Sequence, residues 1–146
     1  MGVFRSTVAA LGLTFSLAFC ASAFAQGMPG VPQQEQLIKV SLLTFNDANI
    51  TGNYAVLHAK VSKPFRDQFP AEKLKEAFKD FATKSIVLDA IANLPAVSTV
   101  PAKIDDDGIL TLIGYFDTKP KQVKYRLRFV PSDLEWKLIG INVDVQ

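Results

Sequence analysis

The clearest hydrophobic pattern in the chain lies in its C-terminal third. Every second residue of the stretch 123–129 is apolar and the residues between are cationic, the apolar positions being Val123, Tyr125, Leu127 and Phe129. This alternation is typical of a strand that buries one face. Apolar runs at 108–116 and 134–145 predict two neighbouring strands. We therefore expect residues 104–145 to form an antiparallel meander.

Helical spacing precedes these strands. Residues 33–48 carry one broad apolar face, formed by Leu37, Ile38, Val40, Leu42, Leu43 and Phe45. A face this wide predicts a central helix that is buried on more than one side. The polar run 46–53 contains several cap and turn residues, and it predicts the end of this helix.

Two shorter helices are predicted next. The first begins near residues 51–53 and places Tyr54, Leu57, His58 and Val61 on one face. Pro64 interrupts it, because proline disfavours helical geometry in the preceding residue, and a turn to Phe69 follows. The second begins at Pro70, and its apolar face consists of Leu74, Ala77, Phe78 and Phe81.

Residues 85–95 fit either a short helix or an irregular link. Residues 96–104 predict a strand at a sheet edge or a bulge, because Pro101 lacks a backbone donor. Asp107-Gly108 then predicts a hairpin turn into the meander. Helices followed by strands indicate an α+β fold, with one domain at residues 33–146.

The N-terminus predicts export. Arg5, an apolar run at 8–19 and the small-residue site Ala23-Phe24-Ala25 make residues 1–25 a signal peptide cleaved before Gln26. The apolar run is too short to span a bilayer, so we expect no transmembrane segment after cleavage. The prediction is a periplasmic or secreted protein, with residues 26–32 as a flexible Gly/Pro-rich leader.

Cys20 is the single cysteine and lies inside the predicted signal peptide. Residues 17–20 loosely match a bacterial lipidation motif, although Phe19 occupies a position where a small residue is expected. Lipidation is thus the alternative to soluble export. Cleavage before Gln26 would leave no thiol, which excludes disulfides and cysteine catalysis in the mature chain.

Composition places the chain among globular proteins. It has 146 residues, of which 49% are hydrophobic and 21% charged, with a formal net charge of +2. A net charge this small, dispersed along the chain, argues against a nucleic-acid partner.

Four segments of the C-terminal half resemble a known family, and they are Asp105–Gly108, Gly114–Phe116, Pro120–Phe129 and Trp136–Val143. They resemble a bacterial exported domain family of unknown function within the nuclear transport factor 2-like superfamily. The resemblance implies a cone, in which a strongly curved sheet wraps around the helices and leaves a pocket at its open end. Gly114 and Gly140 are expected bend points, since the inward phase of the last strand changes after Gly140.

His58 is the single histidine. With Tyr54 one turn earlier, it could face the inside of the implied cone. Enzymes of the superfamily often use a histidine or aspartate there as general base, and imidazole suits that role near neutral pH. The alternatives are a hydrogen-bonded packing residue and a ligand contact without chemistry.

The inward row 123–129 offers no carboxylate as a second catalytic group. Aromatic residues remain as candidate ligand contacts, namely Tyr54, Tyr115, Tyr125 and Trp136. The alternative for each tyrosine is a core residue whose hydroxyl reaches water, and the alternative for Trp136 is a packing anchor.

Two charged runs are candidates for ion binding. A calcium loop needs alternating acidic residues and a distant glutamate, so Asp105-Asp106-Asp107 predicts an acidic hairpin tip instead. The cations Lys124, Arg126 and Arg128 predict a solvent-facing strand, with anion binding as the alternative. We predict no metal and no cofactor.

The strand at 109–116 is apolar on both faces. A sheet covered by helices on one side only would leave the other face in water, so we expect a homodimer through that outer face. The predicted function is a non-enzymatic exported module for a small apolar or amphipathic ligand or a protein partner. The alternatives are an isomerase- or dehydratase-like enzyme with His58 as base, and a structural dimer without a pocket.

Overall fold

The computed structural model describes residues 26–146, so the predicted signal peptide and Cys20 lie outside the described residues. The helices are α1 (Val31–Thr51), α2 (Ala55–Lys60), α3 (Lys63–Gln68), α4 (Ala71–Ala77), α5 (Lys79–Thr83) and the 3-10 helix η1 (Asp89–Asn93). The strands are β1 (Val97–Ser98), β2 (Lys103–Ile104), β3 (Leu110–Phe116), β4 (Val123–Ser132) and β5 (Glu135–Val145). Helices therefore precede strands, which confirms the α+β class.

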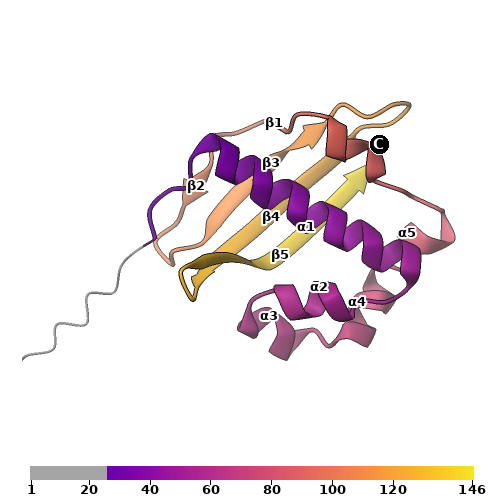
Figure 1. Cartoon of the computed structure of the whole chain (residues 1–146), viewed down its shortest axis with the longest axis horizontal. Coiled ribbons are helices and arrows are strands. Elements are labelled where there is room, and N and C mark those ends of the chain that lie inside the picture. Colours follow the sequence, from indigo (N-terminus) through magenta and orange to yellow (C-terminus); the bar gives the residue numbers. More distant parts are fainter. Residues whose placement is uncertain (1–25) are drawn as a thin grey trace, which may run out of the picture.

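The five strands form one antiparallel sheet in the order β1-β3-β4-β5, with β2 also paired to β3. The meander predicted for residues 104–145 is confirmed. Helix α1 crosses one face of this sheet, while α2, α3 and α4 gather near one edge (Figure 1). The inward row predicted on β4 is buried beneath α1 at all four positions, Val123, Tyr125, Leu127 and Phe129.

A bulge in β5 changes which of its side chains face the helices. Arg128 pairs with Gly140 and Phe129 pairs with Leu138, which leaves Ile139 without a partner on β4. One extra residue shifts the alternation by one position and increases the local twist. The phase change predicted at Gly140 is confirmed.

Gly114 is required for a close approach. A Cβ atom on this residue would lie 2.1 Å from the Val97 carbonyl oxygen and 2.5 Å from the Tyr125 hydroxyl oxygen. Neither distance is compatible with a side chain. Glycine here makes room for β1 on one side and for the Tyr125 hydroxyl on the other.

Helix α1 continues three residues beyond its predicted end, through the polar run, and stops at Gly52 with φ 68°. Glycine adopts this left-handed conformation without strain. Asn46 and Asn49 are buried inside the helix and do not cap it. The Asn46 side chain bonds to Leu88 and Asp89, and the Asn49 side-chain oxygen accepts a hydrogen bond from the Tyr54 hydroxyl, so these partners override the local preference for a helix end.

The predicted turn before Phe69 is in fact the short helix α3, which carries Pro64 in its first turn, where proline is tolerated. The predicted helix from Pro70 is divided into α4 and α5 at Phe78, and Ala77 is exposed instead of buried. The division allows the rings of Phe78 and Phe81 to contact Phe45, with centroids 4.8 and 5.0 Å away.

The leader before the first helix is shorter than the predicted 26–32, and hydrogen bonds attach it to the folded domain instead of leaving it flexible. Helix α1 begins at Val31, because Gly30 and Pro32 suit the start of a helix. Pro29 is buried, and its carbonyl accepts a hydrogen bond of 2.8 Å from the Gln34 amide. The Gln26 amide donates to the Leu134 carbonyl at 3.1 Å, which ties this segment to the β4–β5 turn.

Two further segments, 85–95 and 96–104, are only partly regular in the structure. Within 85–95, η1 is flanked by irregular chain, and the strand predicted at 96–104 is divided into β1 and β2 with Pro101 in the gap. The Asp105 carboxylate accepts hydrogen bonds from the backbone N–H groups of Asp107 and Ile109, at 3.0 and 2.9 Å. These bonds form the predicted acidic turn.

Candidate functional site

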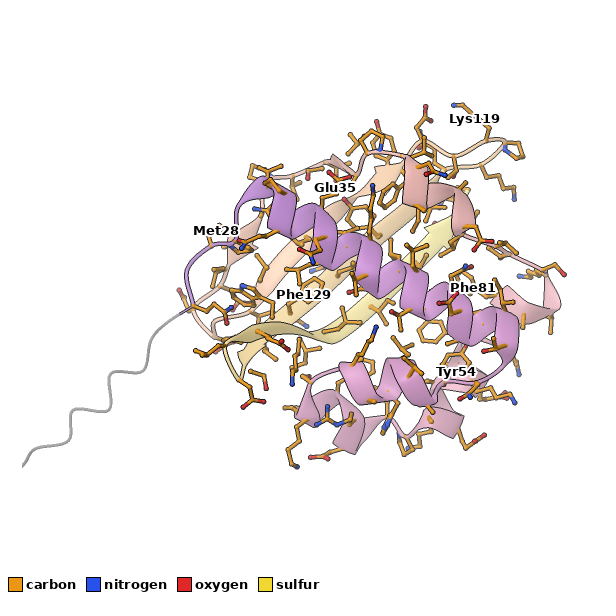
Figure 2. All side chains as sticks on the ribbon, in the orientation of Figure 1. Met28, Glu35, Tyr54, Phe81, Lys119 and Phe129 are labelled. Carbon is orange, nitrogen blue, oxygen red and sulfur yellow. The ribbon has the colours of Figure 1, made fainter. Side chains whose placement is uncertain are left out.

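An open cleft of about 530 Å³ lies between the N-terminal half of α1 and the hairpin of β4 and β5. Its lining residues are Gln26, Gly27, Met28, Pro29, Gln33, Gln36, Leu37, Val40, Glu135 and Trp136. In Figure 2, Met28 lies on the segment that precedes α1, at the mouth of this region.

A second, smaller cleft of about 90 Å³ continues the first toward α2. Its lining residues are Leu37, Val40, Ser41, Thr44, Leu57, Lys60, Val61, Phe129, Trp136 and Leu138. The two clefts share Leu37, Val40 and Trp136, so they form one continuous depression. We name it the α1–β5 groove.

The broad apolar face of α1 explains this groove. Ile38 and Leu42 are buried against the sheet, whereas Leu37 is only half-buried and Val40 remains 48% exposed. Before the bulge, Trp136 has the inward phase of β5 and faces the same side as Leu138. Helix and hairpin thus present apolar side chains to each other at a place where nothing in the described chain fills the space between them.

The polar groups of the groove differ between its two ends. The outer end, near Met28, carries the amides of Gln26, Gln33 and Gln36, and Glu135 is its only charged lining residue. The inner end carries the hydroxyls of Ser41 and Thr44 beside the ammonium of Lys60. The groove is therefore amphipathic, with an uncharged floor and one cation at its inner end.

Leu134 adds an unusual apolar side chain close to the groove. It is 87% exposed, and its φ of 65° is rare for a residue with a branched side chain. Leu134 and Gln26 line a shallow cleft beside the outer end of the groove. An exposed leucine held in such a conformation marks this turn as a candidate contact region.

Among the five predicted ligand residues, Trp136 lines the groove. Tyr125 is only 3% exposed and packs against Phe116, with ring centroids 5.7 Å apart. Burial raises the pKa of Tyr125 to about 12, and the Glu35 carboxylate adds to this shift. Ser98 opposes the shift, but no described residue makes a hydrogen bond of good geometry with the Tyr125 hydroxyl.

Tyr54 and His58 both lie at α2, as predicted. Tyr54 is buried, its hydroxyl donates to the side-chain oxygen of Asn49, and burial raises its pKa. His58 is half-buried, and its Nε2 lies 3.4 Å from the Arg66 carbonyl oxygen on α3. Neither residue lines the α1–β5 groove.

Tyr115 lies neither in the core with Tyr125 nor at α2 with Tyr54 and His58. It pairs with Lys124 in the register of β3 and β4, on the sheet face opposite the helices. The sheet therefore separates Tyr115 from Tyr125. The five candidates do not converge on one site, because the strand phase and the α1–α2 connection direct them to different regions.

Several groove residues carried no functional signal in the sequence. Lys60 and the segment 26–29 stand far from Trp136 in the chain, and only the fold brings them together. The one available signal was the excess width of the apolar face of α1, which includes Leu37 and Val40. Within residues 26–146, no cluster of three or more His, Cys, Asp or Glu side chains could hold a metal ion.

No family model, no curated protein and no solved structure matches this chain. In the part of the chain that the structure describes, no helix combines the length and apolarity required to cross a bilayer.

Proposed function

We propose that this protein is an exported, non-enzymatic module that binds a small apolar or amphipathic ligand in the α1–β5 groove. The observation that carries the proposal is the groove itself, about 530 Å³ in its outer part, with Leu37, Val40 and Trp136 forming a continuous apolar floor. Concave apolar surfaces with a few polar groups are the usual form of ligand sites. Exposed apolar groups, Met28 in the groove and Leu134 in the cleft beside it, also favour binding over a purely structural role.

The proposal includes the nuclear transport factor 2-like cone and export. In such a cone, a groove between the first helix and the curved sheet would be the open end. Cleavage before Gln26 would retain Gln26–Pro29, the segment that lines the outer end of the groove. The intact mass of the protein recovered from the cell envelope checks this: a mass that still includes residues 1–25 contradicts cleavage.

The enzyme alternative has less support. General base catalysis by His58 would require this side chain in a cavity together with a second polar group. His58 instead faces the Arg66 carbonyl between α2 and α3, outside the groove. Tyr54, its proposed partner, is buried and donates its hydroxyl hydrogen to Asn49.

Trp136 provides a direct test, since it is the single tryptophan of the chain. We expect the neutral fluorophore N-phenylnaphthylamine to change the Trp136 fluorescence of residues 26–146 in a saturable way. Val40→Glu should weaken this binding at least tenfold, because a carboxylate on the apolar floor would be desolvated by the ligand.

Val100→Glu is the matched control, since Val100 is 46% exposed and lies outside the groove, compared with 48% for Val40. This variant should bind the fluorophore like the wild type. An absent or non-saturable response in the wild type, or equal effects of the two substitutions, would contradict binding in the groove.

A further inference from the structure

We propose that the ligand of the α1–β5 groove is an amphiphile with an alkyl chain and a single carboxylate, and that Lys60 binds the carboxylate. This inference rests on the proposed function, and it assigns the chemical class of the ligand and its direction in the groove.

Lys60 is held at the inner end of the groove by the fold. It is the last residue of α2, and two residues later the Ser62 N–H donates to the Leu138 carbonyl on β5 at 2.9 Å. This hydrogen bond fixes the end of α2 beside β5. Lys60 therefore lines the same depression as Trp136, and its ammonium lies 3.5 Å from the hydroxyl of Thr44, another lining residue.

The Lys60 ammonium is available for an anion. Its one hydrogen bond is a long contact of 3.5 Å to the Thr44 hydroxyl, and within residues 26–146 it makes no ion pair. Lys60 also lines an adjoining cleft together with Thr44 and Asp47, but it forms no ion pair with the Asp47 carboxylate. Ser41 and Thr44 provide hydroxyl donors beside the ammonium, a combination that suits a carboxylate.

The rest of the groove suits an alkyl chain. From Lys60 the lining continues over Leu57, Phe129 and Trp136 to Leu37 and Met28, and the next charged lining residue is Glu135 at the outer end. Along α1, the groove extends from Gln33 to Thr44, which corresponds to about 16 Å of helix. A chain with its head at Lys60 would lie along this floor and end near Met28.

The outer end of the groove disfavours a second carboxylate. Glu135 is the only charged lining residue there, and the other polar groups are amides of glutamine. A ligand with carboxylates at both ends would place like charges close together, which is destabilising. The charge pattern therefore selects a monocarboxylate over a dicarboxylate or an amine.

The experiment is competition for bound N-phenylnaphthylamine by decanoate and by decanol, which share a chain length and differ in the head group. Wild-type residues 26–146 should bind decanoate about tenfold more tightly than decanol, a difference that corresponds to about 1.4 kcal/mol. Lys60→Met keeps the apolar stem and removes the charge. It should abolish the preference by weakening decanoate alone.

Lys73→Met is the control, because Lys73 is exposed on α4 and lines neither cleft of the groove. It should retain the full preference for decanoate, and circular dichroism should show both variants folded. Equal affinity of the wild type for the two competitors, or a preference that survives in Lys60→Met, would overturn the assignment of Lys60 while groove binding stands. Failure of the wild type to bind the fluorophore or either competitor would overturn the proposed function as well.

Discussion

At the scale of single residues, Tyr125 has the most unusual environment. Its ring is a core side chain that faces α1, whereas its hydroxyl lies in the space left by Gly114 and finds no hydrogen-bond partner among the described residues. A buried hydroxyl without a partner loses its hydration and gains nothing in return. The ring therefore stabilises the fold, and the hydroxyl does not.

We expect Tyr125→Phe to leave the free energy of unfolding unchanged or to raise it by about 1 kcal/mol, as measured by urea denaturation at pH 7. Tyr54→Phe is the matched control, since the Tyr54 hydroxyl donates to buried Asn49. That substitution should lower the free energy of unfolding by about 1 kcal/mol. A clear loss of stability in Tyr125→Phe would show that its hydroxyl has a partner.

The stability of Tyr125→Phe should also depend less on alkaline pH than that of the wild type. Burial raises the pKa of Tyr125 from 10.0 to about 12 in the folded protein, so the unfolded chain loses its proton first as pH rises. Between these two pKa values the free energy of unfolding therefore decreases as pH rises. Tyr125 alone contributes at most about 1.4 kcal/mol per pH unit to this decrease. Unfolding measured between pH 10 and 12 should therefore show a shallower decline for Tyr125→Phe than for the wild type. Parallel declines would contradict the raised pKa.

At the scale of secondary-structure elements, Asn46 connects α1 to η1. Its side-chain oxygen accepts a hydrogen bond of 2.8 Å from the Leu88 N–H, and its amide donates to the Asp89 carboxylate at 2.6 Å. Leu88 and Ile91 are buried in the core at this junction. A polar residue of α1 thus holds η1 through two side-chain hydrogen bonds.

Asn46→Ala should lower the free energy of unfolding by about 2 kcal/mol, because the Leu88 N–H would remain buried without an acceptor. Hydrogen exchange at Leu88 should accelerate more than exchange in β4. Asp47→Ala, at the next position of α1 and exposed, should change stability by less than about 0.5 kcal/mol. Equal effects of the two substitutions would mean that Asn46 does not hold η1.

At the scale of the whole molecule, the outer face of the sheet combines apolar and cationic side chains. Lys124, Arg126 and Arg128 are exposed along β4, and Ile113 on β3 pairs with Arg126. The Arg128 stem passes over Gly140, where an added Cβ would lie 3.4 Å from it. The apolar side chains predicted to drive dimerisation are therefore partly covered by the stems of cations.

The homodimer through this face stays a prediction, and the cations add a condition to it. A two-fold axis near β4 would bring the guanidinium groups of two copies together, and salt screens such repulsion. We expect sedimentation of residues 26–146 to show more dimer at high salt than at low salt. Ile113→Ser should remove the dimer, whereas Ile50→Ser, on the exposed side of α1, should not. A monomer at micromolar concentration in both salts would contradict the prediction.

Much of the fold could be predicted because its signals are local. The alternation around Leu127 requires a strand with one buried face, and the phase change at Gly140 requires an extra residue in β5. Predictions failed where distant groups override local preference. The sequence around Asn46 predicts a helix end, but the helix continues because the Asn46 side chain accepts a hydrogen bond from the Leu88 N–H. The predicted helix from Pro70 is interrupted at Phe78, where the Phe78 and Phe81 rings both pack against Phe45.

The candidate site was less predictable than the fold. Trp136, predicted as a ligand contact, lines the groove, whereas Tyr54, Tyr115 and Tyr125 lie elsewhere. The hydrophobic period of a sequence does not show which apolar positions remain uncovered in the fold. By itself the sequence determined the class of the fold, the meander and the bulge, because backbone periodicity expresses short-range sterics and burial. Only the tertiary structure decided that Lys60, Trp136 and the segment before α1 share one groove, because that depends on where the ends of α2 and the β4–β5 hairpin meet in space.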